Sequence, residues 1–349
     1  MTMQPPAIIP HSRPFLGAEE AHAVTEVITT GGLAEGPVTA AYERELGERM
    51  GCAHAVAVSS GTAALHLALA ALGIGAGDEV IIPSFVCTAL FHAVAAVGAT
   101  PVPADIDPAT LNLDPGDVER RITARTRALI LAHMFGRMAD PGPFTRFGLA
   151  LIEDCAHALG ATCADRQAGS FGHAAVVSSY ATKMIATGEG GAVATSSAPL
   201  ASAVRDLKQY DHRPLDRVRC NCKFTELQAA MGCVQLRRLD EFIRRRREIA
   251  ARFRSSLGPP AGDTDREGEH VYFRYVIDAG SNADDFIRAA RLNGIACERP
   301  VHEPLHRLLN RTGFPATEEM WRRCVSIPIY PALTAAEVEH IVSVAASLR

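Results

Sequence analysis

The feature that most constrains the fold is an alternation of short apolar runs and helix-like stretches between Val56 and about Thr195. Such alternation is typical of a mostly parallel sheet with helices on both faces. The last two apolar runs are separated only by a loop, so the sheet is expected to be mixed. The expected strands are Ala55–Ser59, Glu79–Pro83, Pro101–Ile106, Ala128–His133, Ala150–Asp154, Ala174–Tyr180 and Gly191–Thr195, and the expected helices are Thr62–Leu72 and Thr88–Val97.

The pattern changes after Thr225. A helical pattern over Thr225–Phe253 predicts one long connecting helix, and Gly258–Gly268 is rich in Gly, Pro and Asp, which predicts a turn or linker. The remaining expected elements are a helix at Ala18–Val27, a strand at Val271–Ile277 and helices at Ala283–Leu292 and Ala335–Leu348. The predicted fold class is therefore α/β, with a large α/β domain over residues 1–240 and a smaller α+β domain over residues 241–349.

Composition excludes several classes of partner. The formal net charge is −4, so no overall basic field attracts nucleic acid or anionic lipid. The arginines at 237–238 and 244–247 lie in a helical pattern and are better explained as a solvated helix face than as a nucleic-acid patch. No apolar stretch reaches the roughly 18 residues needed to span a bilayer, and the N-terminus lacks the pattern of a signal peptide. A cytoplasmic protein without nucleic-acid or membrane partners is expected.

The nine cysteines do not predict a metal site. Only Cys220 and Cys222 lie close together, and no second pair or His-x-x-x-His stands nearby to complete four ligands. We expect reduced thiols, most of them small core residues.

Three sequence features fall where loops follow strands. The first, Ser59–Thr62, lies directly between an apolar run and a helix. Free backbone N–H groups at a helix N-terminus bind anions, and glycine lets a phosphate approach the backbone closely. An ordinary helix cap is the alternative.

The second feature is an acidic pair, Glu153 and Asp154, that closes an apolar strand, with His157 three residues later. A carboxylate at the end of a buried strand is costly unless it is paired. One suitable partner is the protonated pyridine nitrogen of pyridoxal 5′-phosphate (PLP), which then acts as an electron sink. A capping aspartate and a structural histidine are the alternatives.

The third feature is Lys183, which lies in a turn with glycines between two expected strands and follows Ser178–Thr182. Imine formation needs a neutral amine, and burial or a neighbouring cation supplies one by lowering the lysine pKa. An anion loop, a strand-end carboxylate and a loop lysine in this order together predict a PLP enzyme.

These residues belong to a longer ordered set of short motifs, by which the chain resembles the DegT/DnrJ/EryC1/StrS sugar aminotransferases, within the aspartate-aminotransferase fold type of PLP enzymes. The resemblance runs nearly end to end. The motifs are Arg13-Pro14, Gly36-Pro37, Ser60–Leu65, Gly77–Ile81, Pro83-Ser84, Gly98-Ala99, Pro101-Val102, Glu153-Asp154, His157, Ser178, Lys183, Gly188–Gly191, Asn221, Glu226–Ala230, Pro304–His306 and Pro328–Pro331.

The resemblance implies a PLP-transferase fold and assigns roles. Lys183 matches the residue that forms the internal aldimine and moves the proton between the substrate Cα and the cofactor. Asp154 matches the partner of the pyridine nitrogen, and His157 a position near the ring hydroxyl. Asn221 matches a residue that reaches the phosphate from the neighbouring subunit, which implies a homodimer with shared active sites. The phosphate loop of the family and its surroundings are matched by Ser60, Gly61, Thr62, Ala63 and Ser178.

The resemblance also implies substrates. The donor is expected to be glutamate or glutamine, and the acceptor a keto-sugar, usually linked to a nucleotide. Tyr180, Glu189 and His306 are the candidate substrate residues. The sequence departs from the family at Cys87, where an aromatic ring usually stacks on the cofactor. The alternatives are that Phe85 or Phe91 replaces this ring, or that the cofactor rests on a thinner apolar wall.

Other functions remain open from sequence alone. Another PLP reaction, such as a lyase, epimerase or dehydratase reaction, would use a similar site, although Lys183 argues against the dehydratase branch in which histidine replaces lysine. A non-catalytic binding protein would be expected to lose Lys183 or Asp154, and both are present. A nicotinamide-dependent dehydrogenase is disfavoured because no G-x-G-x-x-G follows the first strand.

Overall fold

The computed structural model describes residues 8–263, 269–280 and 282–349. In this part of the chain the helices are α1 (Ala18–Thr30), α2 (Pro37–Met50), α3 (Gly61–Ala71), α4 (Ala89–Ala96), α5 (Pro115–Arg121), α6 (Gly142–Thr145), α7 (Ala198–Leu207), α8 (Glu226–Arg237), α9 (Leu239–Leu257), α10 (Ala283–Leu292), α11 (Leu305–Leu308), α12 (Pro315–Arg323) and α13 (Ala335–Ser347), with a 3-10 turn at Met134–Gly136.

The large sheet has seven strands in the order β1-β9-β8-β5-β4-β2-β3, and β9 runs antiparallel to its two neighbours. The other pairs are parallel. The α/β class and the mixed sheet are therefore confirmed. The strands are β1 (His54–Val58), β2 (Glu79–Pro83), β3 (Thr100–Ala104), β4 (Thr126–Ala132), β5 (Ala150–Asp154), β8 (Ala174–Ser178) and β9 (Gly191–Thr195), and two short pairs are β6 (Thr162–Cys163) with β7 (Arg166–Gln167) and β10 (Tyr275–Asp278) with β11 (Cys324–Ile327).

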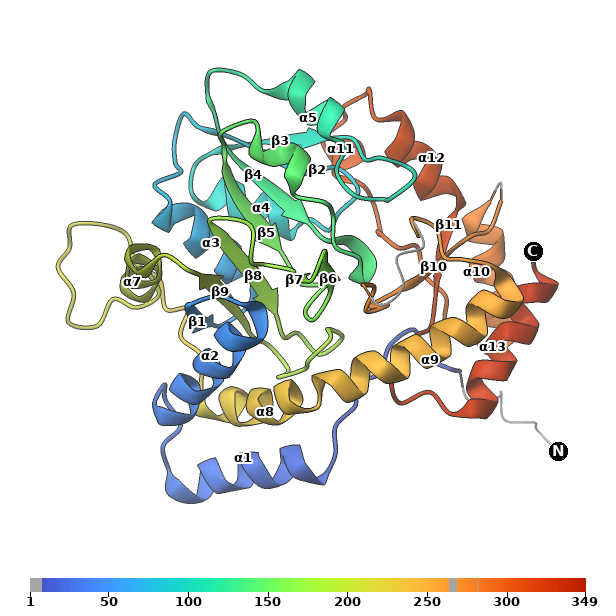
Figure 1. Ribbon diagram of the computed structural model, residues 1–349, viewed down its shortest axis with the longest axis horizontal. Helices are drawn as coiled ribbons and strands as arrows, with labels where there is room; N and C mark the ends of the chain where they lie inside the picture. Colours follow the sequence, from blue (N-terminus) through green and yellow to red (C-terminus); the bar gives the residue numbers. More distant parts are fainter. Residues whose placement is uncertain (1–7, 264–268, 281) are drawn as a thin grey trace.

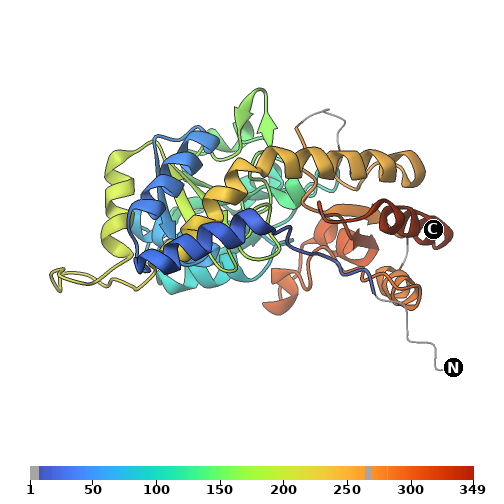
Figure 2. The ribbon, with the colours of Figure 1, turned by 90° about the horizontal axis from the view of Figure 1, so that it is seen from below.

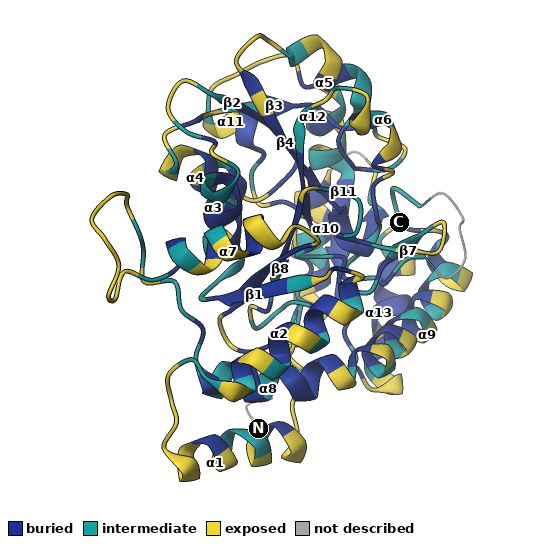
Figure 3. Cartoon of the chain, turned by 60° about the vertical axis from the view of Figure 1, so that its left-hand side comes forward, coloured by how far each residue is buried: buried dark blue, intermediate teal, exposed yellow. Residues whose placement is uncertain are grey.

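Helices cover both faces of the large sheet because its strands are apolar on both sides (Figures 1 and 3). In β8, Ala174 and Val176 pack with α3, α4 and α7, whereas Ala175 and Val177 pack with α2 and α8. On this second face, α5 and α6 cover the strands toward the β3 edge. The carboxyl ends of β1, β2, β5 and β8 thus meet at one edge of the sheet, where α/β proteins form their binding sites.

The second, smaller unit packs α9, α10 and α13 around β10 and β11. Contacts cross the predicted boundary at residue 240 in both directions. The N-terminal segment joins the smaller unit, because Ile9 pairs in parallel with Ile295, and Val301 and Leu305 belong to the core of the large sheet. The boundary itself stays a prediction.

Several expected elements differ from the observed ones by one to three residues at an end, and two differ more. The single helix over Thr225–Phe253 is two helices, because Arg238 has φ −90° and ψ −3°, which interrupts the regular helix between α8 and α9 (Figure 2). The strand expected from Val271 begins only at Tyr275, because the amides of Val271 and Arg274 donate to Gly136 and Phe135 instead of to a strand. Part of the linker expected over Gly258–Gly268 lies outside the described residues.

A buried carboxylate joins α8 to α2. Glu226 accepts hydrogen bonds from the backbone amides of Gly36, Val38 and Thr39 and from the Thr39 hydroxyl, at 2.7–2.9 Å. These donors belong to the first turn of α2, whose amides have no partner within the helix. Burial raises the pKa of Glu226, but the four hydrogen bonds outweigh it and hold the pKa below its ordinary value.

The Glu226→Gln variant is expected to lower the free energy of unfolding by about 2–3 kcal/mol, since a charged acceptor is replaced by a neutral amide. A carboxylate whose pKa is lowered by folding contributes stability above its unfolded pKa and loses it as the pH falls through the folded value. The difference between wild type and variant should therefore shrink below about pH 4. Urea unfolding at pH 7 and at about pH 3 measures both effects, with Glu48→Gln on the exposed side of α2 as the control. An equal loss of unfolding free energy in the two variants at pH 7 would contradict the role given to Glu226.

Candidate active site

A cavity of about 220 Å³ opens at the carboxyl edge of the large sheet. It gathers residues from the ends of β1, β2, β5 and β8 and from the β8–β9 loop. Of the predicted site residues, it brings together Ser60, Gly61, Thr62, Cys87, Asp154, Ser178, Tyr180, Lys183 and Glu189.

The N-terminus of α3 forms one end of this cavity. Ser60 is its N-cap, in extended conformation, and its hydroxyl accepts the Ala63 amide at 3.1 Å. The first backbone hydrogen bond of the helix is donated by Ala64 to Ser60, so the amides of Gly61 and Thr62 precede the helical ladder. The alternative prediction, a helix cap, is thus observed at Ser60, and it leaves the amides of Gly61 and Thr62 without a partner within the helix, so the anion site stays a prediction. The Ala63 amide is used by the cap.

Glycine is required where α3 meets the strand ends. A Cβ on Gly61 would lie 2.8 Å from Cβ of Ser178, which is closer than real Cβ atoms approach. Ser178 is paired in register with Gly191 of β9. A Cβ on Gly191 would lie 2.6 Å from the backbone of Ser60 and Gly61. The two glycines therefore bring backbone from three segments together beside the anion site.

The Gly61→Ala variant is expected to weaken PLP binding about 10- to 100-fold, because Ser178 and the helix start must separate to admit the methyl group. Equilibrium titration of cofactor-free protein with PLP measures the change. Gly75→Ala, beyond the other end of α3, is the matched control, since its Cβ would meet only a carbonyl oxygen at 3.6 Å. Equal affinities for the two variants would show that this contact does not shape the anion site.

Asp154 lies at the last position of β5 and is 8% exposed. Its Oδ1 accepts the Ala156 amide at 2.9 Å. Burial raises the pKa of this carboxyl group, and the nearby Lys183 acts in the opposite direction. Within the described residues no arginine or lysine forms an ion pair with it, so a cationic ring nitrogen in the cavity would supply the missing partner.

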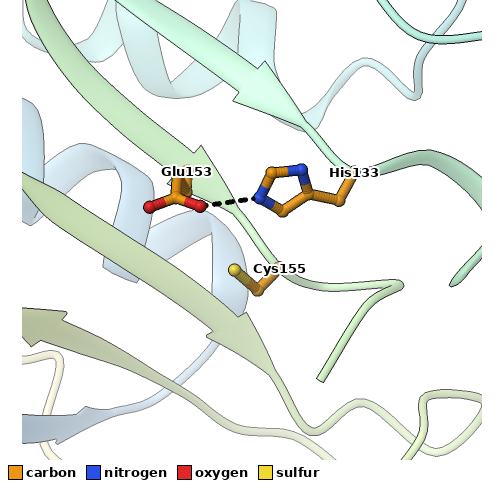
Figure 4. A group of neighbouring side chains, drawn as sticks. All are labelled: His133, Glu153 and Cys155. Atoms are coloured by element: carbon orange, nitrogen blue, oxygen red, sulfur yellow. Dashed lines mark hydrogen bonds and ion pairs between the residues drawn. The ribbon is translucent and has the colours of Figure 1, made fainter. Parts of the chain in front are cut away.

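Glu153, the preceding residue, points to the other side of the strand and has a structural role (Figure 4). Its carboxylate accepts the amides of Gly169, Phe171 and Gly172 and a hydrogen bond from His133 Nε2 at 2.9 Å. The His133 Nδ1 atom accepts the Ala139 amide, which places the ring proton on Nε2. His133, Glu153 and Cys155 lie together, but these hydrogen bonds occupy the donor atoms that a metal ion would need, and burial raises the Cys155 pKa well above its ordinary value.

Lys183 lies in the loop between β8 and β9, which is closed by backbone hydrogen bonds. The Ser179 amide donates to Gly190, the Ala181 amide to Gly188 and the Lys183 amide to Tyr180. The Nζ atom lies 5.0 Å from the centroid of the Phe273 ring. Burial lowers the pKa of Lys183, and Asp154 opposes this shift, so the amine is more readily deprotonated than a free lysine.

His157 stands behind the cavity wall. Its ring stacks on Phe273 at 4.2 Å between centroids and lies 6.2 Å from Phe135. Burial, with Lys183 and Arg274 nearby, lowers the His157 pKa well below its ordinary value, so the imidazole is neutral at physiological pH. It is close to Lys183, but it is not part of the lining.

Three predicted residues lie elsewhere. Phe85 is fully buried and packs edge-on against Phe135, with 6.0 Å between ring centroids, so it is not free to stack on a cofactor. His306 is held by Ser84 at 2.7 Å and Glu318 at 2.8 Å. Asn221 is exposed on the connection between α7 and α8 and does not line the cavity of its own chain.

The apolar part of the wall was not predicted from the sequence; it consists of Leu65, Ala89, Leu90, Ala156 and Val176. Ala156 and Val176 stand close to Asp154 and Ser178 along the chain, and this proximity was the one available signal. Among the described lining residues, Tyr180 is the single aromatic one, so Cys87 and aliphatic groups form most of the apolar surface of the cavity. Phe273 and Arg274 were also missed, because they follow Lys183 by some ninety residues and belong to no recognisable motif.

The cavity fits PLP. This cofactor needs an anion site for its phosphate, a carboxylate for its ring nitrogen and an amine for its aldehyde. The α3 amides, Asp154 and Lys183 offer these three functions from one cavity. Together with the mixed sheet, they place the protein in the class of PLP-dependent enzymes.

Comparisons with known proteins agree. The model of the DegT/DnrJ/EryC1/StrS aminotransferase family matches residues 14–345. The spore coat polysaccharide biosynthesis protein SpsC of Bacillus subtilis is 33% identical, over 96% of this chain and 95% of that protein. The GDP-perosamine synthase of Caulobacter vibrioides is 34% identical, over 95% of each chain. The crystal structure of DesV from S. venezuelae, in complex with a ketimine intermediate, has a TM-score of 0.89 at 33% identity and covers 97% of this chain and 98% of its own.

The chain belongs to the DegT/DnrJ/EryC1/StrS aminotransferase family. It is a PLP-dependent aminotransferase of the group that serves amino-sugar biosynthesis. None of the described helices is long and apolar enough to cross a membrane.

Proposed function

We propose that this enzyme moves an amino group from glutamate or glutamine to the ketone of a nucleotide-linked sugar. The observation that carries the proposal is the meeting of Lys183, Asp154 and the α3 N-terminus at one cavity. Relatives support the acceptor class, because one is named for the synthesis of a GDP-linked amino sugar, perosamine, and another for polysaccharide biosynthesis.

The residues of this chain divide the work. The amides of Gly61 and Thr62, with Ser178, hold the phosphate, and Asp154 keeps the ring nitrogen protonated. When bound, PLP supplies an electron sink for the negative charge that develops at the substrate carbon bearing the amine. Nζ of Lys183 takes the proton from that carbon as a general base and would deliver it, as a general acid, to the cofactor carbon that carried the aldehyde; the second half-reaction reverses this transfer. Tyr180 and Glu189, exposed at the mouth of the cavity, are the proposed acceptor contacts.

We also propose a homodimer in which Asn221 enters the partner's site. Residues 211–218 form an exposed projection from the body of the molecule (Figures 1 and 2). Leu215 and Val218 are almost wholly exposed, and such apolar side chains favour a protein contact. Asn221 follows this projection and is itself exposed.

Absorbance of the PLP-loaded enzyme tests the first half of the reaction. Adding glutamate or glutamine should convert the visible band of the bound cofactor to that of its amine form, and a keto-sugar nucleotide should then restore the original band. Alternating half-reactions predict ping-pong kinetics. A cofactor band that no amino donor converts would instead favour a lyase or epimerase. Failure to bind PLP at all would overturn the assignment.

A further inference from the structure

The ring of Phe273 lies beside the lysine of the active site, although this residue does not line the cofactor cavity. Lys183 Nζ lies over the ring, 5.0 Å from its centroid. The face of an aromatic ring carries partial negative charge and attracts a cation that lies within about 6 Å of the centroid. Phe273 is only 3% exposed, and such an attraction is stronger where water is excluded.

The backbone of Phe273 is held from two sides. The amide of Arg274, the next residue, donates to the carbonyl of Phe135 at 3.1 Å. A Cβ on Gly136 would lie 2.5 Å from the amide nitrogen of Phe273, so this close approach of two backbone segments requires glycine. On the other side, NH1 of Arg246 in α9 donates to the carbonyl of Phe273 at 3.4 Å. The ring is therefore fixed by segments that precede β10 and follow β4, and by α9.

His157 fixes the orientation of the ring itself. The two rings are stacked, with 4.2 Å between centroids and 20° between planes. Burial lowers the pKa of His157 well below its ordinary value, so the imidazole is neutral and brings no third positive charge to this place. The position of the Phe273 ring thus depends on the surrounding protein and not on the state of Lys183.

The charged and titratable groups that act on Lys183 among the described residues are Asp154, Cys87 and Arg274. Asp154 favours a positive Nζ, but this carboxylate is the partner proposed for the ring nitrogen of the cofactor. Burial raises the pKa of Cys87, so its thiol is neutral. Arg274, whose Cζ lies 4.8 Å from the centroid of the Phe273 ring, disfavours a positive Nζ. When the cofactor engages Asp154, Phe273 is the described neighbour that still stabilises the cation.

We propose that Phe273 acts through Lys183: its ring positions and stabilises the ammonium form that the lysine takes while it carries the substrate proton. In the proposed reaction the C–H bond of the substrate breaks, its electron pair is drawn toward the cofactor, and the proton forms a bond to Nζ. Nζ stays positively charged until it delivers this proton. The assignment rests on the proposed function and extends it to a residue outside the cavity.

The test replaces Phe273 with phenylalanines that carry one, two or three ring fluorines, because fluorine weakens the negative ring face with little change of shape. In the cofactor-free protein at neutral pH, acetylation of Lys183, followed by peptide mapping, should become about tenfold faster across the series, since less of the amine is protonated. In the PLP-loaded enzyme, the conversion of the cofactor band by glutamate should become about tenfold slower, since the ammonium form is less stable.

Phe135 is the matched control. It is also buried and lies 6.2 Å from the His157 ring, but Lys183 lies over Phe273 and not over Phe135. The same fluorinated residues at this position should change neither rate by more than about twofold. Rates that stay level along the Phe273 series, two rates that change in the same direction, or equal changes in the two series would overturn the assignment.

Failure of the proposed function gives a different result. A wild-type enzyme that binds PLP but is converted by no amino acid would overturn the proposed function, and the proton-carrying role of the ammonium form with it. A level Phe273 series in an enzyme that glutamate does convert would overturn the role of Phe273 alone.

Discussion

Replacing Lys183 with alanine is expected to lower kcat by about 10⁴-fold or more, because the variant loses both the covalent attachment of PLP and the group that moves the proton. The wild-type amine is held at the cavity by the hydrogen-bonded β8–β9 loop, and burial lowers its pKa. No other lysine lines the cavity among the described residues. Steady-state turnover and retention of cofactor on dialysis measure the loss.

Borohydride reduction followed by peptide mapping makes this prediction specific to the residue. In wild type the cofactor should be found on the peptide that contains Lys183. The control is Lys223→Ala, which removes a half-buried lysine paired with Asp211 at 2.7 Å and should leave the cofactor on the peptide that contains Lys183. Reduction onto a different lysine, or appreciable turnover by the alanine variant, would disprove the role proposed for Lys183.

The Asp154→Asn change is expected to reduce kcat by about 10²- to 10³-fold while leaving the fold intact. A neutral amide cannot keep the ring nitrogen protonated, and a buried charge pair with one partner removed typically costs about 3–5 kcal/mol. Asn retains the shape of the side chain and its contact with the Ala156 amide. Turnover with glutamate measures the loss of kcat, and circular dichroism shows whether the fold is intact.

A cofactor analogue separates this electronic role from a structural one. PLP methylated at the ring nitrogen carries a fixed positive charge and should restore part of the activity of the asparagine variant, but not raise that of wild type. Asp240→Asn, at an exposed aspartate paired with Arg49, is the control and should behave as wild type. An asparagine variant with full activity on PLP would show that the ring nitrogen does not depend on Asp154.

Local sequence patterns were sufficient to predict that the strands of the large sheet exist and, for three of them, where they begin and end. Glu79–Pro83, Ala150–Asp154 and Gly191–Thr195 were predicted at their observed limits, because apolar runs of this length bounded by polar or glycine residues have few alternatives to a buried strand. Helix limits were less certain where side chains from distant segments decide them. Helix α2 begins at Pro37 after the N-cap Gly36 and was not predicted, and its first turn depends on Glu226 from α8.

For the site, sequence identified the residues whose chemical type is unusual for their local setting. These are a carboxylate ending an apolar strand, a lysine in a glycine-bounded loop and a serine-glycine pair before a helix, and the structure brings Asp154, Lys183 and Ser60 to one cavity. It could not predict that Phe85 is buried against Phe135, or that His306 is held by Ser84 and Glu318. Those outcomes depend on packing between segments far apart in the chain.

The sequence by itself therefore determined the class of fold, the cofactor chemistry and the residues able to perform it, since strand periodicity and residue type act locally. Only the tertiary structure decided which of these residues share a cavity, which neighbours tune their pKa values, and that Arg274 lies within 10 Å of Lys183. The physical reason is that burial and Coulomb interactions depend on distance in space. Chain folding sets that distance, and it brought together two residues that lie 91 positions apart.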